Sequence, residues 1–454
     1  MRRAALSTDA LAPRLAALAL VAFAYALDAQ TPAPTMPGEP PRNSLAITGV
    51  SVVDVASGGI LPNSTVLIDG GTIASVSRNA APPVNARVVD GRGKYLIPGL
   101  WDMHAHMEGS GEAWLELYVA NGVTGIRDMG SDLDFILPLR DATASGRIVG
   151  PRIIAAGPIL DDAPEAWPFR MRVRDAEEGR AAVRLLKRRG VDLIKVHNLT
   201  PRDAFFAIAG EARRQNLPVA GHVPSDVTIE EAIDAGLTSI EHLAEFRLWT
   251  SCSAGTDYRP EACRAFFAML ARRGIWQTPT LVAMSEILAI GTPASTVSAE
   301  RLVYATRSIR ELWAGNQRKF ATPERIQRLR TLAQVSAVVT SDMAKAGVRI
   351  IAGCDAMIAG FCVHDELVAM VRGGMTPLAA LQTATINPAL YLGRDKALGT
   401  VAPTRIADLV LLDGNPLEDI ANVRRIRAVV IRGRILERPE LDRILTHAKL
   451  VAQQ

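Results

Sequence analysis

The sequence is poor in aromatic residues and in histidine, and it carries no dense cluster of charge of one sign. Phe, Trp and Tyr make up 5% of the 454 residues, and the formal net charge is only +4. The sequence lacks a basic patch interleaved with aromatic residues, which argues against nucleic acid as a partner. The chain is longer than one hydrophobic core usually organises, so we expect one large domain and a smaller one.

Cysteine is also scarce. Four cysteines in a chain of this length do not make a disulfide scaffold, and no CxxC spacing typical of a zinc site is present. Cys252 and Cys263 lie eleven residues apart in one polar stretch, where either a local disulfide or two free thiols would fit. Cys354 precedes an aspartate, and we expect its side chain to serve packing.

An apolar run at residues 15–26 is too short to span a bilayer comfortably. It follows the basic start MRR and ends at a small-x-small sequence, AYA, at residues 24–26. These features predict a cleaved signal peptide over residues 1–29 and a periplasmic or secreted protein, with an uncleaved anchor as the alternative. Residues 30–43 read as a Pro-rich linker, and we expect no stable membrane insertion after cleavage.

Residues 44–97 and 397–440 contain short runs rich in β-branched residues. Asp69-Gly70-Gly71 is typical of a hairpin turn between two such runs. The expected strands cover residues 46–53, 65–68, 72–76, 408–412, 428–431 and 435–436. Because the two segments flank a long middle part, we predict that they meet in one small β-sandwich built from both chain ends. Residues 441–454 are expected to be a C-terminal tail.

Residues 98–396 alternate short strands with longer helical stretches, such as 176–189 and 201–215. The expected strands cover residues 100–106, 122–128, 152–156, 192–196, 218–222, 239–242, 276–280 and 349–355. Eight β-then-α units predict an α/β fold, a (β/α)8 barrel of the TIM type. A charged, mostly helical stretch at about 298–346 interrupts the pattern after the seventh strand, and we expect this insertion to cover the mouth of the barrel.

Four of the seven histidines fall at the ends of the expected strands. His104 and His106 are two residues apart, so both imidazoles point to the same face of one strand. Later strands end at four more side chains of interest: Lys195, His222, His242 and Asp355. Active sites of such barrels form at the carboxyl ends of the strands, so the pattern predicts a metal-dependent site there.

The segments around these residues resemble the amidohydrolase superfamily, and the resemblance covers roughly residues 45–437. The matching segments are LIPGLWDMHAHM (96–107), DLIKVH (192–197), VAGH (219–222), SIEH (239–242), IAGCDA (351–356) and ALGTVAPTRIADLVLLDGNPLED (397–419). Together with PLAALQTATINPA (377–389), the set is most similar to the imidazolonepropionase-like and prolidase-like branch. Each segment alone is weak, but their combination in this order is specific.

The resemblance implies two divalent metal ions. His104, His106 and Asp355 would hold the first ion, and His222 and His242 would hold the second. Imidazole and carboxylate together suit zinc best among the common divalent ions. A metal-free scaffold with this barrel would have lost ligands, whereas here every expected position is filled.

The resemblance also implies that Lys195 is carboxylated by CO2 and bridges the two ions. A lysine ammonium is a poor metal ligand, whereas a carbamate on its nitrogen is an anionic oxygen donor. Two ions that share a water lower its pKa, so hydroxide exists near neutral pH. Asp355 would then carry the proton to the leaving nitrogen.

Three further residues are candidates for substrate contacts. His197 stands two residues after Lys195, where this branch commonly has tyrosine, and an exposed loop histidine is the alternative. His364 precedes a helical stretch, where capping is the alternative. Arg127 follows the second strand and offers a cation for a substrate carboxylate, although surface arginines are common.

The expected reaction is hydrolysis of an amide bond in a small substrate. By the resemblance, dipeptides, Xaa-Pro dipeptides and N-acyl amino acids are the obvious class. The alternative is opening of a cyclic amide of the imidazolone type, or cleavage of an ester or lactone, at the same site. A homo-oligomer is possible, and the sequence does not name the substrate because specificity lies in the loops.

Overall fold

The computed structural model describes residues 44–107, 113–164, 169–244, 247–250, 252–253, 257–283, 299–307, 309–311, 322–356 and 358–453. The expected signal peptide and linker, residues 1–43, lie outside the described residues, as does part of the expected insertion. The described residues belong to one compact unit, Asn43–Gln454. None of the described helices is long and apolar enough to cross a membrane.

Both ends of the chain contribute to one eight-stranded sheet. Its strands are β1 (Leu45–Val53), β2 (Ile60–Asp69), β3 (Thr72–Arg78), β4 (Arg87–Asp90), β5 (Tyr95–Pro98), β16 (Leu409–Leu412), β17 (Ile426–Ile431) and β18 (Arg434–Glu437). The two ends join where β5 and β16 pair antiparallel, with Pro98 opposite Leu409 and Tyr95 opposite Leu412. The predicted meeting of the two segments is therefore confirmed. The described strands form one connected sheet, so a two-layer sandwich is not confirmed.

The middle of the chain forms two parallel sheets. The three-stranded sheet contains β6 (Leu100–Ala105), β7 (Val123–Asp128) and β8 (Arg152–Ala155). The seven-stranded sheet contains β9 (Ile159–Asp161), β10 (Arg170–Arg172), β11 (Ile194–Val196), β12 (Val219–Gly221), β13 (Leu237–Glu241), β14 (Trp276–Thr278) and β15 (Arg349–Ile350). Each of the eight expected strands overlaps one of these, and β9 and β10 are additional.

Backbone hydrogen bonds join the two parallel sheets at both edges of the three-stranded sheet. The N–H of Met103 in β6 donates to Ala352 O, which follows β15, at 2.9 Å. At the other edge, the N–H of Asp192 donates to Ala155 O of β8 at 2.8 Å. The sheets therefore approach each other as in a barrel, but the described strands do not close into one continuous ladder.

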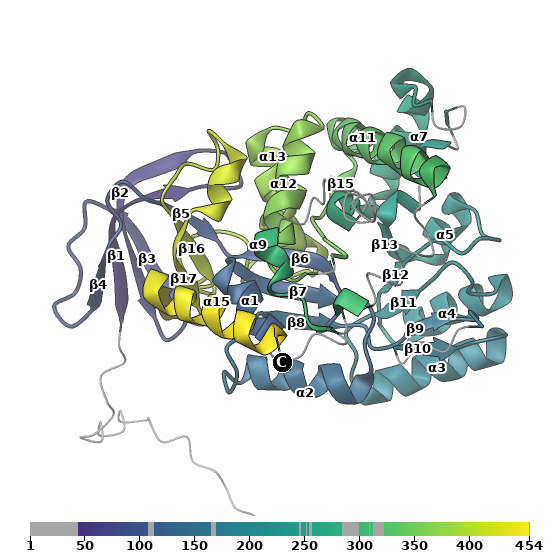
Figure 1. The fold of residues 1–454 in the computed structure, drawn as a ribbon, viewed down its shortest axis with the longest axis horizontal. Helices are drawn as coiled ribbons and strands as arrows, with labels where there is room; N and C mark the ends of the chain where they lie inside the picture. Colours follow the sequence, from purple (N-terminus) through teal and green to yellow (C-terminus); the bar gives the residue numbers. More distant parts are fainter. Residues whose placement is uncertain are drawn as a thin grey trace, which may run out of the picture. The chain divides into compact units, whose positions relative to one another are not determined.

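Helices follow the parallel strands, and their limits agree with simple terminal signals. The sequence prediction of a helix over residues 176–189 is confirmed by α3 (Ala176–Arg189). The Asp175 side chain accepts the first N–H groups of α3, and Gly190 ends it with a left-handed φ of 86°. Figure 1 shows α3, α4 (Arg202–Arg214) and α5 (Ile229–Ala235) outside strands β9 to β13.

The other described helices of the barrel region are α1 (Ala113–Ala120), α2 (Leu133–Ala144), α6 (Arg247–Thr250), α7 (Pro260–Arg273), α9 (Ala299–Leu302), α11 (Pro323–Lys345), α12 (Cys362–Arg372), α13 (Pro377–Thr383) and α14 (Ile386–Tyr391). Two of them, α9 and α11, fall in the expected insertion. Two short 3-10 helices, η1 (His242–Ala244) and η2 (Ile420–Arg424), complete the set.

The segment expected to be a tail forms a helix, α15 (Arg438–Ala452). It packs beside α1 (Figure 1), and its residues Leu441, Ala448 and Ala452 are buried. The reason is an apolar stripe on a helix that begins with a capping box between Glu437 and Glu440.

Leu441→Ala should lower the free energy of unfolding by about 2–5 kcal/mol, because it leaves a cavity where a fully buried side chain was. Leu450→Ala is the matched control, since Leu450 lies in the same helix and is 57% exposed. Denaturant titration of both variants measures the difference. Equal stability of the two variants would contradict the packing of α15.

Candidate active site

Four histidines from three strand ends come together in one cluster. His104 lies in β6 and His106 just after it, His222 follows β12, and His242 follows β13. The ring centroids of His104 and His106 are 5.4 Å apart, those of His104 and His242 are 4.6 Å apart, and those of His222 and His242 are 4.7 Å apart. The structure therefore brings together the four histidines that the sequence pattern selected.

Asp355, which follows β15, lies among three of these imidazoles. Its Oδ1 is 3.5 Å from His106 Nε2 and 4.0 Å from His104 Nε2. Its Oδ2 is 3.7 Å from His242 Nε2. One ligand atom each from His104, His242 and Asp355 lies within 4.8 Å of the other two, a spacing that suits a metal ion. The carboxylate is thus placed between the histidines expected to hold different ions.

The other nitrogen of each imidazole is held by the protein. The hydrogen-bond partners of Nδ1 are Glu241 Oε2 for His104 (2.8 Å), Gly130 O for His106 (3.1 Å), Asn198 Oδ1 for His222 (2.8 Å) and Thr280 Oγ1 for His242 (2.7 Å). A hydrogen bond at Nδ1 fixes the ring and presents Nε2 as the lone-pair donor. His104 Nε2 is buried without a hydrogen-bond partner, which is what a metal ligand would show before its ion is counted.

Burial keeps two of these imidazoles, those of His104 and His222, neutral. It lowers the pKa of His104 well below its usual value, and the nearby Lys195 lowers it further. Burial also lowers the pKa of His222, with His197 and Lys195 adding to the effect. Neutral imidazole is the form that coordinates a metal ion. Burial raises the pKa of Asp355, an effect that the neighbouring His106 opposes.

Lys195 lies in β11 and is 1% exposed. Its charge acts on both His104 and His222, so the lysine lies near histidines from both expected halves of the site. Gly221 makes room beside it: a Cβ at this position would lie 3.1 Å from Lys195 Cδ and 2.1 Å from Val196 O. The glycine of the VAGH segment is therefore required for close packing of β11 and β12.

The position of Arg127 does not support the expected contact with a substrate. The side chain is fully buried and its guanidinium donates to Glu241 Oε1 and Oε2 at 2.9 and 3.0 Å. It also donates to Met103 O at 2.6 Å and to the hydroxyls of Ser239 and Tyr391, each at 2.9 Å. These protein acceptors take the donors that a substrate carboxylate would need.

Glu241 is the residue that sequence reasoning missed. Burial alone would raise its pKa, but Arg127 and Lys195 hold the pKa below its usual value, so it stays ionised. It receives His104 Nδ1 on one side and Arg127 on the other. The signal for it was a glutamate as the last residue of a mostly buried strand, one residue before a strand-end histidine.

His197 and His364 have different surroundings. The ring of His197 lies 4.0 Å from that of His222, and its Nδ1 is 3.4 Å from the buried Asp161 Oδ2, so it adjoins the histidine cluster. His364 lies in α12, is 2% exposed, and its Nε2 is 2.9 Å from Asn121 O after α1. The expected substrate role of His364 is not supported by this position, because its ring joins two outer helices.

All four cysteines are paired. Cys252 and Cys263 form a disulfide with Cα atoms 4.9 Å apart, which decides between the two alternatives left open by the sequence. Cys354 forms a second disulfide with Cys362, with Cα atoms 5.8 Å apart. Cys354 is buried, as expected for packing, but the expectation missed its covalent partner.

His364→Ala should leave kcat/KM unchanged but lower the free energy of unfolding by about 1–3 kcal/mol through the lost buried hydrogen bond. Burial lowers the pKa of His364 from 6.5 to about 4, so protonation favours the unfolded chain. The contribution of neutral His364 to the free energy of unfolding of the wild type is then lost as the pH falls from 6.5 towards 4. The variant lacks this group, so its free energy of unfolding should fall less over the same pH range. Unfolding at several pH values, with His447→Ala as an exposed control, measures it. A fall in kcat/KM without loss of stability would restore the substrate role.

Comparison with known proteins identifies the family. The chain matches the amidohydrolase family over residues 95–436. Ochratoxinase from Aspergillus niger is 26% identical over 436 residues, and the match covers 81% of each chain. Bottromycin amidohydrolase has a similar structure, with a TM-score of 0.74 and 25% identity over 91% of each chain. A putative prolidase from Bifidobacterium longum shares the fold, with a TM-score of 0.70 and 24% identity over 90% of this chain and 100% of its own.

Similar proteins also include an adenine deaminase and a dihydroorotase. The family match and the structural likeness to prolidase-like proteins confirm the resemblance drawn from the sequence motifs, and they give the fold as an α/β fold of the TIM-barrel type. The chain belongs to the amidohydrolase family, and it is a hydrolase.

Proposed function

We propose that this protein hydrolyses an amide C–N bond in a small peptide-like substrate, such as a dipeptide, an Xaa-Pro dipeptide or an N-acyl amino acid. The observation that carries the proposal is the convergence of three imidazoles on the Asp355 carboxylate, within 4.0 Å. Relatives named as an ochratoxinase and a prolidase support this bond type. A cyclic amide, an ester or a lactone is the alternative substrate at the same site.

The side chains fit divalent metal ions. His104 offers a buried Nε2 that no protein group satisfies, and the cluster supplies neutral imidazoles and a carboxylate. We propose two ions, zinc being the best match for these donors, held by the side chains expected from the sequence: His104, His106, Lys195, His222, His242 and Asp355. When bound, the ions supply a water of lowered pKa and polarise the scissile carbonyl.

Lys195 supports the two-ion proposal through its burial and its neighbours. As an ammonium it opposes any positive charge near His104 and His222, because it lowers the pKa of both. Carboxylated, the same side chain would be an anionic oxygen donor at the same place. Burial of this lysine beside imidazoles is therefore better explained by the carboxylated form.

We propose Asp355 as the group that moves a proton. It lies within hydrogen-bonding or water-bridging reach of His106, His104 and His242. Burial raises its pKa, which brings the carboxylate closer to the range where it can both accept and release a proton near neutral pH. We propose that it takes a proton from the attacking water and passes it to the leaving nitrogen. We also propose that the protein acts after export, on the strength of its N-terminal sequence.

Lys195→Ala should reduce the bound metal from two ions per chain to one or none and abolish most of the hydrolysis. Elemental analysis of the purified protein measures the metal, and a panel of dipeptides, N-acyl amino acids, cyclic amides and lactones measures activity and substrate class. Lys345→Ala is the control, because that side chain is 63% exposed. A Lys195→Ala protein with two ions and full activity would refute the bridge.

Glu241→Gln should weaken metal retention or activity by about 10- to 100-fold, the usual cost of losing a partner that orients a metal-binding histidine. Glu211→Gln, a buried carboxylate of α4 that pairs with Arg214, is the control. Chelator competition at fixed pH measures retention without relying on a substrate. Identical retention in both variants would show that Glu241 serves only the packing around Arg127.

A further inference from the structure

We propose that the Cys354–Cys362 disulfide is a positioning element of the active site, which holds Asp355 against β6 and makes activity depend on the oxidised state of this one bond. The inference rests on the proposed function, because it assigns Asp355 its role at the metal site. It concerns residues for which the sequence motifs gave no role beyond packing.

The disulfide lies directly beside Asp355. Cys354 immediately precedes it, and Cys362 is the first residue of α12. Both sulfur-bearing side chains are buried, with 1% and 3% exposure. The bond therefore ties the strand end that carries Asp355 to the start of the following helix.

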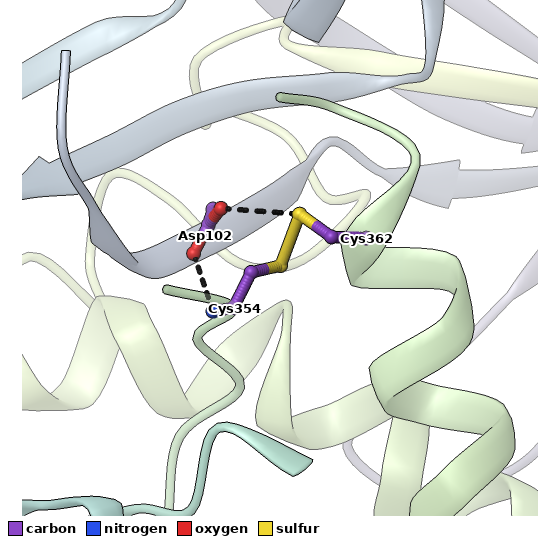
Figure 2. A group of neighbouring side chains, drawn as sticks. All are labelled: Asp102, Cys354 and Cys362. Atoms are coloured by element: carbon purple, nitrogen blue, oxygen red, sulfur yellow. Dashed lines mark hydrogen bonds between the residues drawn. A yellow bond between two sulfur atoms is a disulfide. The ribbon is translucent and has the colours of Figure 1, made fainter. Parts of the chain in front are cut away.

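Asp102 contacts both cysteines of this clamp (Figure 2). Its Oδ1 accepts the N–H of Cys354 at 3.0 Å and the N–H of His104 at 3.1 Å, and its Oδ2 lies 3.6 Å from Cys362 Sγ. One carboxylate thus fixes the backbone of the first-strand ligand and the backbone next to Asp355. The disulfide adds a covalent link between Cys354 and Cys362, the two cysteines that this carboxylate contacts.

Asp355 needs such a clamp because its backbone is strained. Its φ is 51°, in the left-handed region that a residue other than glycine adopts only at an energetic cost. Its N–H donates to His104 O at 2.8 Å. Gly353 allows this close approach, since a Cβ there would lie 2.7 Å from His104 N. With the disulfide removed, only hydrogen bonds hold this backbone, from Cys354 N–H to Asp102 and from Asp355 N–H to His104 O, and it can relax away from the left-handed conformation.

The second disulfide provides a contrast. Cys252 and Cys263 are also buried or half-buried and close a short loop, but their bond joins the segment after α6 to α7. Cys252 Sγ lies 3.6 Å from Leu248 O, and Cys263 Sγ lies 3.3 Å from Ser253 Oγ; neither Leu248 nor Ser253 belongs to the histidine cluster. Loss of this bond should affect stability alone.

The experiment compares the wild type with Cys354→Ala/Cys362→Ala and with Cys252→Ala/Cys263→Ala, all as full chains loaded with zinc. Peptide mapping without reduction first tests the pairing in the active wild type. We expect the Cys354/Cys362 variant to lose about 10- to 100-fold in kcat with a smaller change in KM, since a displacement of about 1 Å can cost about 100-fold. We also expect faster zinc release to a chelator. The Cys252/Cys263 variant should keep wild-type kcat and zinc release, with only a lower Tm.

Reduction provides a second measurement that does not depend on folding of a variant. A phosphine cleaves the S–S bond to two thiols and becomes the phosphine oxide, with water supplying the oxygen and both protons. Applied to the Cys252→Ala/Cys263→Ala protein, which holds one disulfide, it should reproduce the loss of kcat in proportion to the thiols formed. Free Cys354 and Cys362 thiols in the fully active wild type would overturn the proposal. So would unchanged kcat and zinc release in the Cys354/Cys362 variant. A wild type that binds no metal would instead refute the proposed function.

Discussion

Arg127 and Glu241 form an ion pair that is not exposed to solvent. The pair lies beside His104, whose Nδ1 is bonded to Glu241. An isolated buried charge would destabilise the fold by several kcal/mol, and an ion pair compensates only when hydrogen bonds satisfy the remaining donors. Arg127 meets this condition through Glu241, Met103 O, Ser239 and Tyr391. Because Arg127 comes from the three-stranded sheet and Glu241 from the seven-stranded one, the pair also fixes the spacing between the two sheets.

The same pair determines the electrostatics of the site above it. The positive charge of Arg127 offsets the negative charge of Glu241. His104 can therefore donate a hydrogen bond to the Glu241 carboxylate and stay a neutral imidazole. Burial then dominates and lowers the pKa of His104 well below its usual value. The hydrogen bond at Nδ1 leaves Nε2 directed towards Asp355, 4.0 Å away. A buried structural ion pair thus prepares a neutral lone pair at the place where a cation is expected.

The positions of eight parallel strands and the convergence of the four histidines followed from the sequence, because parallel strands alternate faces with a period of two and end at one edge. The limits of α3 were predicted as residues 176–189, and the structure shows capping by Asp175 and Gly190 at these limits. What could not be predicted is the partner of each polar side chain. Arg127 follows the same face rule whether it meets a substrate or Glu241, and Cys354 looks the same whether it packs or bonds to Cys362. The periodicity of a strand predicts the direction in which a side chain points. Its contact partner depends on which other segment of the chain packs there, and periodicity does not predict that.

Backbone strain at the strand ends explains both the limits of prediction and the demands of the site. His242, Thr280 and Asp355 all have φ values of 50–54°, although none is glycine. Each costs about 1–3 kcal/mol, and no local sequence signal specifies it. The surrounding contacts must supply that energy, as the Asp355 N–H bond to His104 O does. Bound ions would add to it, since a ligand at 100 times its Kd contributes about 2.7 kcal/mol. That contribution is similar to the strain of one such residue, so the occupied site and the strained strand ends would stabilise each other.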